Sequence, residues 1–313
     1  MDLMRLGFSV LSATQARGHL TILIFHRVLP RPDEIFPDEV HAQRFEQICA
    51  WLKCWFQVLP LDEAGRLLAE GRLPSRACCI TFDDGYADNH EVALPILQKQ
   101  GLCATFFIAT GFLNGGRMWN DTVIESIRHC RQQHLDFGNF GSYGLSGPAE
   151  RRGAIEAIIG KIKYLPVEQR LAITEELLAR CGVQLDARLM MAPDGVRLLR
   201  DAGMQIGAHT VSHPILASTP PDAAREEILS SKRFLEDLLS QDCTLFAYPN
   251  GKPGRDYLPE HVTMVRELGF KTAVSTAWGA SGVGADPLQL QRFTPWDRTK
   301  TAFGLRLMRN LLA

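Results

Sequence analysis

The chain has 313 residues, enough to bury a large core within a single α/β domain. Apolar residues make up 46% and charged residues 22% of it, a composition that is typical of globular proteins and excludes a disordered one. The formal net charge of −1 gives no electrostatic reason to expect nucleic acid or an anionic membrane as a partner, and no run of about 20 apolar residues predicts an integral membrane segment.

The first 18 residues contain only a short apolar stretch, with an acidic residue as well as a basic one near its start. This is a poor secretion signal, so we expect a cytoplasmic protein, with a location at the membrane periphery as the alternative. The eight cysteines form no CxxC pair and lie in apolar segments, as expected of reduced, buried thiols. No pattern predicts the oligomeric state.

Apolar runs alternate with helix-like patterns along most of the chain. The predicted strands are residues 20–26, 77–82, 103–109, 204–209, 244–248, 271–276 and 288–293. Continuous apolar runs of this kind are typical of parallel strands that are covered on both faces. Amphipathic patterns, such as those at 41–55 and 225–239, predict the intervening helices. The order favours a parallel α/β barrel or a doubly wound sheet.

The stretch from 112 to 192 interrupts this alternation. It contains several helical segments and a patch rich in glycine and serine at 137–147. We expect it to be a helical insertion between the third and fourth strands, within a single catalytic domain that spans residues 1–313.

Four polar side chains follow two of the predicted strands. Asp83 and Asp84 come directly after residues 77–82, and His209 and His213 lie at and just beyond the end of a later strand. Parallel strands open at the same edge of a sheet, where α/β enzymes place their sites. Two imidazoles and one carboxylate form a typical open site for zinc or another transition metal, and the second carboxylate can then act as a base. The alternative, that both aspartates cap the next helix, explains only one of them.

Two motifs carry a resemblance to a known family. The segments "TFDDG" (81–85) and "HTVSHP" (209–214) resemble the first two motifs of the polysaccharide deacetylases, carbohydrate esterase family 4 with the nodulation-type or chitooligosaccharide deacetylase domain. The resemblance covers about residues 20–111 and 194–295. It implies a distorted, incomplete (β/α) barrel, which here has seven strands.

The same resemblance implies roles for individual residues. Asp83 is expected to be the general base, and Asp84, His209 and His213 are expected to bind a divalent metal. Zn²⁺ is the first expectation for that metal, with Co²⁺ or Ni²⁺ as alternatives. Thr210 is expected to support the ligands from behind.

The segment "FAYPNG" (246–251) is similar to the third motif of the family. It implies that the backbone N–H of Asn250 stabilises an oxyanion, with Tyr248 and Pro249 beside it as substrate-binding residues. The chain departs from the family in two respects. Ala247 stands where an arginine usually orients the base, and the late Leu-x-x-His motif, whose histidine protonates the leaving amine, is missing.

His26, at the end of the first predicted strand, is a candidate for that missing acid. "ILIFHRVLP" (22–30) resembles the opening motif of the exopolysaccharide branch of the family, the biofilm poly-N-acetylglucosamine deacetylases. A hydrogen-bonded histidine at a strand end is an equal alternative. Arg292 and Asp297 are further candidates for groups that orient the site. Residues 119–121 could reach the site from the insertion, although a helix start explains them more simply.

Together these features predict a metal-dependent carbohydrate N-deacetylase. The substrate would be an N-acetylated sugar in a polysaccharide or in its lipid- or nucleotide-linked precursor, and acetate would be released. One alternative is a hydrolase of a non-sugar amide on the same fold. The other is a non-catalytic glycan-binding protein that contains a metal. The missing arginine and the missing histidine favour this second alternative.

Overall fold

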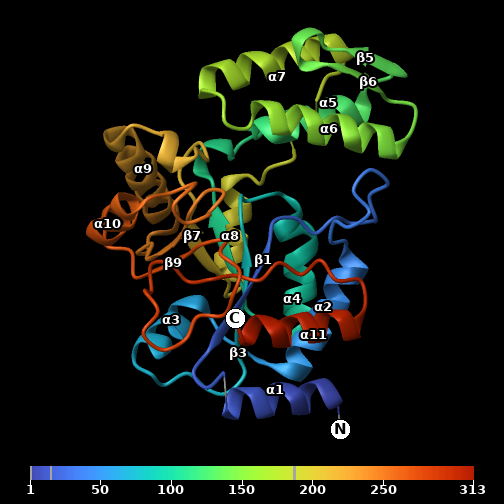
Figure 1. Cartoon of the computed structure of the whole chain (residues 1–313). Helices are drawn as coiled ribbons and strands as arrows, with labels where there is room; N and C mark the ends of the chain where they lie inside the picture. The colour runs from blue at the N-terminus through green and yellow to red at the C-terminus, as the bar shows by residue number, and fades with distance from the viewer. Residues whose placement is uncertain (1, 15, 186–187) are drawn as a thin grey trace.

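The computed structural model describes residues 2–14, 16–185 and 188–313 (Figure 1). The helices are α1 (Leu3–Ala13), α2 (Ala42–Trp55), α3 (Leu61–Ala69), α4 (Leu94–Gln100), α5 (Trp119–His129), α6 (Pro148–Ile162), α7 (Val167–Cys181), α8 (Pro193–Asp201), α9 (Pro221–Leu239), α10 (Pro259–Glu267) and α11 (Lys300–Leu311). The strands are β1 (Leu20–Phe25), β2 (Gln57–Val58), β3 (Ala77–Phe82), β4 (Thr105–Ile108), β5 (His134–Asp136), β6 (Ser142–Gly144), β7 (Gln205–Ala208), β8 (Leu245–Ala247) and β9 (Thr272–Val274).

A curled parallel sheet forms the centre of the molecule. Its strands follow the order β1-β3-β4-β7-β8-β9, and the short β2 pairs with the beginning of β3. Every residue of β1 and β3 is buried, because helices cover the outside of the sheet and apolar side chains fill its inside. Phe82 stacks between Phe25 and Phe106, with ring centroids 5.3 and 4.7 Å away. The predicted incomplete barrel is therefore confirmed.

One predicted strand is wrong. Residues 288–293 form no regular strand; instead, Leu290 makes a single bridge with Val274 of β9 and Phe293 a single bridge with Leu23 of β1. This segment therefore bonds to each of the two outer strands of the sheet in turn. The sheet reaches seven strands through β2, which the prediction missed because its two residues carry no apolar run.

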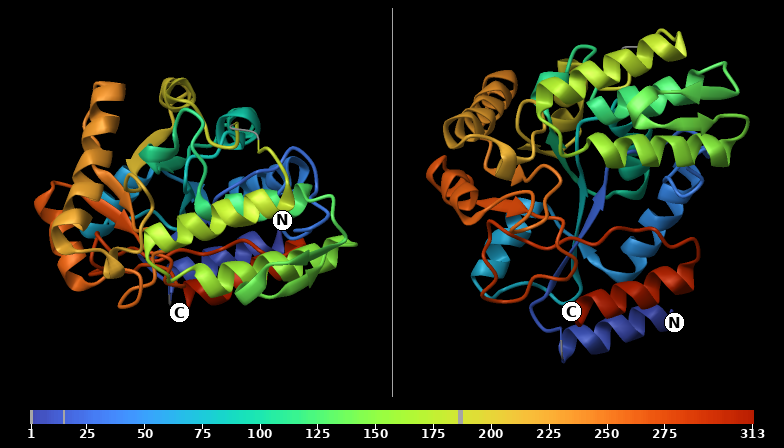
Figure 2. Two further views of the ribbon diagram at one scale, coloured as in Figure 1. Left: turned by 90° about the horizontal axis from the view of Figure 1, so that it is seen from above. Right: turned by 45° about the horizontal axis from the view of Figure 1, so that its top comes forward.

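Residues 112–192, the insertion, connect β4 to α8. They hold α5, α6 and α7, and also a two-stranded antiparallel hairpin, β5–β6, which the helical prediction did not include. Their apolar side chains gather in a cluster of their own, to which only Ile35 and Phe36 are added from outside the insertion among the described residues. Figure 2 shows these helices lying over one end of the sheet. In the described residues, no helix is long and apolar enough to cross a bilayer.

Candidate active site

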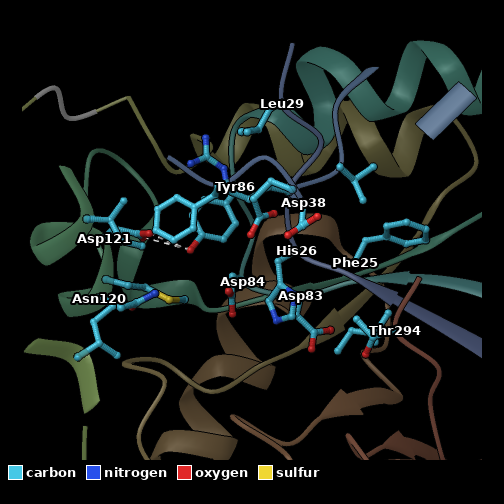
Figure 3. A pocket seen from close by; sticks show the side chains of 18 of the residues that line it. Phe25, His26, Leu29, Asp38, Asp83, Asp84, Tyr86, Asn120, Asp121 and Thr294 are labelled. Atoms are coloured by element: carbon cyan, nitrogen blue, oxygen red, sulfur yellow. Dashed lines mark hydrogen bonds between the residues drawn. The ribbon is translucent and has the colours of Figure 1, made fainter. Parts of the chain in front are cut away.

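The carboxyl ends of the parallel strands point toward the insertion, and the predicted site residues follow them. Asp83 and Asp84 come after β3, His209 comes after β7, and His26 comes after β1. Together with residues of the insertion they line a cleft of about 910 Å³. The structure thus brings side chains from three strand ends to one cleft, and Figure 3 shows those of His26, Asp83 and Asp84.

Asp83 is held by a buried arginine. Nη1 and Nη2 of Arg292 donate to the two carboxylate oxygens of Asp83 at 2.7 and 2.8 Å, and Nε donates to the carbonyl of Ser275 at 2.7 Å. Burial alone would raise the pKa of Asp83, but the Arg292 guanidinium, followed by His209, outweighs it and lowers that pKa below the ordinary value. The carboxylate is therefore ionised at neutral pH. Arg292, from a distant part of the chain, therefore gives Asp83 the cationic partner that Ala247 cannot provide.

Asp84, His209 and His213 form a compact group of possible metal ligands. Nε2 of His209 lies 3.4 Å and Nε2 of His213 lies 3.5 Å from Oδ1 of Asp84. These separations match the spacing of about 3.3–3.5 Å between ligand atoms placed tetrahedrally at zinc–nitrogen and zinc–oxygen distances.

Two further observations fit a cation at this group. Oδ1 of Asp84 is buried and has no hydrogen-bond partner among the described residues, an arrangement that is costly unless the oxygen has a ligand. Nδ1 of His209 lies 2.7 Å from the carbonyl of Ala247, so the ring donates there and its Nε2 lone pair faces Asp84. The three side chains therefore fit a divalent metal.

The charges around the group favour a positive ion. Burial disfavours the charged form of His209, yet Asp84 and Asp83 outweigh this and raise the pKa of His209. Burial would likewise raise the pKa of Asp84, but the two histidines lower it. For His213 burial prevails and lowers the pKa to about 4, so this ring is neutral and can donate its lone pair to a metal.

The backbone at the site is strained. Asp84, Thr210, His213 and Asn250 have φ angles of 78°, 64°, 54° and 58°, in the left-handed region that non-glycine residues rarely adopt. Each costs on the order of 1–3 kcal/mol, so other contacts must hold these residues in place. Such strain is typical of sites in which side chains must point to one spot.

Contacts behind the histidines supply that support. The Thr210 hydroxyl accepts a hydrogen bond from the backbone N–H of His213 at 3.1 Å, and the side chain of Thr210 is fully buried behind the site. Glu227 of α9 accepts hydrogen bonds from the backbone N–H groups of Val211 and Ser212 at 2.9 and 2.8 Å. The sequence analysis missed Glu227, because nothing in the helical pattern distinguishes it from a surface glutamate.

Of the three residues predicted from the third motif, Asn250 lines the cleft, whereas Tyr248 and Pro249 lie behind it. Asn250 lines the cleft, and its backbone N–H donates to no acceptor in the described part of the chain, so it is free to bind an anionic oxygen. The following Gly251 has φ +71° and lies so close to Thr276 that a side chain there would clash. Tyr248 is fully buried and stacks on Tyr257 at 3.8 Å, and Pro249 is buried beside it. Neither side chain lines the cleft, so they support Asn250 from behind.

His26 is exposed on the wall of the cleft. Its charge contributes to lowering the pKa of both Asp83 and Asp84, so it lies within electrostatic reach of both (Figure 3). Asn89 donates to its backbone carbonyl at 2.8 Å and fixes the loop, but no described hydrogen bond involves the ring itself. Asp297, the other orienting candidate, pairs with Arg306 at 2.6 Å rather than with a site residue.

The insertion also contributes to the cleft. Asp121 of α5 is buried and accepts a hydrogen bond from the Tyr86 hydroxyl, which lies 3.1 Å from both of its oxygens (Figure 3). Burial raises the pKa of Asp121 to about 7. Backbone bonds from Ala87 to Leu189 and from Met191 to Gly85 join the same loop to the other end of the insertion. The insertion is therefore fastened directly to the loop that carries Asp83 and Asp84.

Aromatic side chains of the cleft complete its walls. Trp296 lines the cleft and is 70% exposed; the guanidinium of Arg306 lies 5.8 Å from its ring centroid, and the exposed part of the indole is accessible to a ligand. Trp119 also lines the cleft, and the guanidinium of Arg170 lies 4.8 Å from its ring centroid. Trp296 was not singled out by sequence reasoning.

Comparisons with known proteins identify the family of the chain. The polysaccharide deacetylase family model matches residues 70–143 and 150–273. The Bacillus subtilis protein named "Putative polysaccharide deacetylase YxkH" is 24% identical over 295 residues, which cover 93% of this chain and 77% of that protein. The Staphylococcus epidermidis poly-beta-1,6-N-acetyl-D-glucosamine N-deacetylase is 26% identical over 149 residues, or 47% of this chain and 50% of that one.

A solved structure extends the agreement to the fold. The Streptococcus pyogenes deacetylase PplD superposes with a TM-score of 0.61 at 19% identity, over 94% of this chain and 98% of that one. The match of the family model spans well over half of the residues. The chain belongs to the polysaccharide deacetylase family.

Proposed function

We propose that the protein is a metal-dependent N-deacetylase of N-acetylated sugars in a polysaccharide or in its lipid- or nucleotide-linked precursor. The observation that carries this proposal is the position of one ionised, arginine-held carboxylate, Asp83, beside the candidate ligands Asp84, His209 and His213. A binding site for a metal needs no free base next to its ligands. The Asp83–Arg292 pair also weakens the alternative of a non-catalytic protein, because Asp83 has a buried arginine as its partner although residue 247 is an alanine.

In this proposal Asp84, His209 and His213 hold a divalent cation, with Zn²⁺ favoured by the ligand set and Co²⁺ or Ni²⁺ as alternatives. A cation bound there supplies Lewis acidity toward the acetamide carbonyl and makes a water more acidic. Asp83 takes the proton of the attacking water, since its carboxylate is ionised and fixed by Arg292. The N–H of Asn250 donates to the carbonyl oxygen as negative charge develops on it.

His26 is proposed to protonate the departing amine. It follows β1, is exposed on the cleft wall, and lies within electrostatic reach of Asp83 and Asp84. The products would be acetate and a free amino sugar. A volume of about 910 Å³ is at the upper end of the ~300–1,000 Å³ of ligand clefts, which supports a substrate longer than one sugar. Trp296 offers a flat apolar surface to a second sugar ring.

Acetate release tests the proposal. Purified protein with added Zn²⁺ or Co²⁺ is incubated with N-acetylglucosamine oligomers, N-acetylated glycan precursors and non-sugar acetamides. Acetate from the sugars that disappears in Asp83→Asn is the expected result. Turnover of the acetamides alone would favour the non-sugar amide hydrolase, and glycan binding without any turnover would favour the binding protein.

A further inference from the structure

The helices α1 and α11 form a layer at the end of the molecule opposite the insertion (Figure 1). They lie side by side and run in the same direction, with Met4 against Gly304 and Met308 against Gly7. A Cβ on Gly304 would lie 2.9 Å from Sδ of Met4, and a Cβ on Gly7 would lie 2.5 Å from Cε of Met308, so a larger residue at either position would require the methionine side chain to move. The inner faces of the two helices pack on the barrel through buried apolar side chains such as Phe8.

The outer faces of the same helices are apolar but exposed. Leu3, Leu6 and Val10 follow the spacing i, i+3, i+7 on α1 and are 83%, 43% and 55% exposed. Leu305 of α11 and Leu312, which follows the last residue of that helix, are 57% and 52% exposed. Single exposed apolar residues need no explanation, but four leucines and a valine along two adjacent helices are typical of a surface that binds a partner. We name these five residues the terminal-helix face.

The charge of the two helices is of one sign. They contain four basic residues and no acidic one: Arg5, Lys300, Arg306 and Arg309. Asp2 and Asp297, outside the helices, pair with Lys300 and Arg306. Arg5 and Arg309 are exposed and make no ion pair with any residue that the structure describes. The near-zero net charge of the whole chain therefore conceals a local positive surface.

We infer that the terminal-helix face binds the surface of a lipid bilayer that contains anionic lipids. Helices with an apolar stripe flanked by arginines lie in the interface of such a bilayer, where leucines enter the acyl boundary and arginines meet the head groups. A second copy of the chain fits this face less well, because a symmetric contact would bring positive charges together. The insertion, whose residues line part of the cleft, lies at the other end of the molecule (Figure 1), so this orientation keeps the insertion away from the bilayer.

Vesicle binding tests this inference without any reference to catalysis. The full chain is sedimented with phosphatidylcholine vesicles that contain or lack phosphatidylglycerol, at low and high salt. The wild-type protein is expected to bind the anionic vesicles and to be released by salt. Leu6→Ser with Val10→Ser is expected to lower the partition coefficient by at least about tenfold, as is Arg5→Glu with Arg309→Glu.

The control carries the same type of change elsewhere. Leu171→Ser with Leu198→Ser alters two exposed leucines on α7 and α8, which are 49% and 55% exposed, and is expected to bind like the wild type. All variants should retain the unfolding temperature and the acetate release from a water-soluble substrate, so that failure of this inference is distinct from failure of the proposed function. The inference is overturned if the wild type binds no vesicle, if Leu6→Ser with Val10→Ser binds as tightly as the wild type, or if that variant instead abolishes a dimer.

Discussion

Replacing Arg292 with methionine leaves the Asp83 carboxylate buried without its bidentate partner. Burial is the largest influence on the pKa of Asp83 and raises it, while Arg292 is the largest influence that lowers it. Without the guanidinium, burial prevails and the pKa of Asp83 rises. Asp83 must be ionised to act as a base, and with a raised pKa it stays protonated up to a higher pH. The acid limb of the kcat/KM profile is therefore expected to move to higher pH.

The magnitude follows from the burial of the pair. Arg292 and Asp83 are both at most 2% exposed, and removal of one partner of a buried ion pair costs about 3–5 kcal/mol of the free energy of unfolding. Near neutral pH, loss of the ionised base is expected to reduce kcat/KM by about 10²–10⁴-fold. Activity that returns at alkaline pH distinguishes a shifted base from a collapsed site.

The assay is acetate release as a function of pH, together with denaturant unfolding. The double variant Asp83→Asn, Arg292→Met has no buried charge at this position, so it is expected to recover part of the lost stability while it remains inactive at every pH. If Arg292→Met keeps the wild-type acid limb, then Arg292 does not set the ionisation of the base and the reasoning is refuted.

Four further predictions follow from the site. His213→Ala is expected to abolish the rise in unfolding temperature on addition of Zn²⁺, which for one site at about 100 times the Kd corresponds to about 2.7 kcal/mol; an unchanged rise would place the metal elsewhere. Asp121 has a folded pKa of about 7, above the ordinary 3.8, so the folded chain binds its proton more tightly and the free energy of unfolding falls as pH increases through that interval, by up to about 4 kcal/mol. Denaturant unfolding across the interval should show a flatter profile for Asp121→Asn, and equal slopes would contradict the burial argument. Trp296→Ala should raise KM for oligosaccharides several-fold with little change in kcat, whereas an unchanged KM would mean that no sugar stacks there. His26→Ala should lower kcat by about 10²–10⁴-fold in steady-state acetate release, and a wild-type rate would assign the proton donor to another group.

The sequence was informative where a property is local. Buried strands are recognisable in the sequence as apolar runs. The polar residues that follow them lie close together because parallel strands end at the same edge of the sheet. For this reason the sheet could be predicted, and so could the convergence of Asp83, Asp84, His209 and His213.

Other features depend on contacts between distant segments, so the sequence could suggest Arg292 as an orienting group but not identify its partner. Arg292 reaches Asp83 across 209 positions, and only the path of the irregular segment 288–293 between β9 and β1 brings it there. The same irregular path explains why the apolar run at 288–293 was wrongly predicted to be a strand. The hydrogen bonds of Glu227 to the histidine loop, and the burial of Tyr248 behind Asn250, likewise arise from packing that no local spacing encodes.

The most direct test measures bound metal and acetate release on the same samples. Wild type, Asp83→Asn and His213→Ala are stripped with a chelator, reconstituted with Zn²⁺ and assayed on an N-acetylglucosamine oligomer. We expect the wild type to bind one ion per chain and release acetate, Asp83→Asn to keep the ion but release none, and His213→Ala to lose both. Acetate release by Asp83→Asn at the wild-type rate, or by stripped wild type, would contradict the assignment of base and ligands.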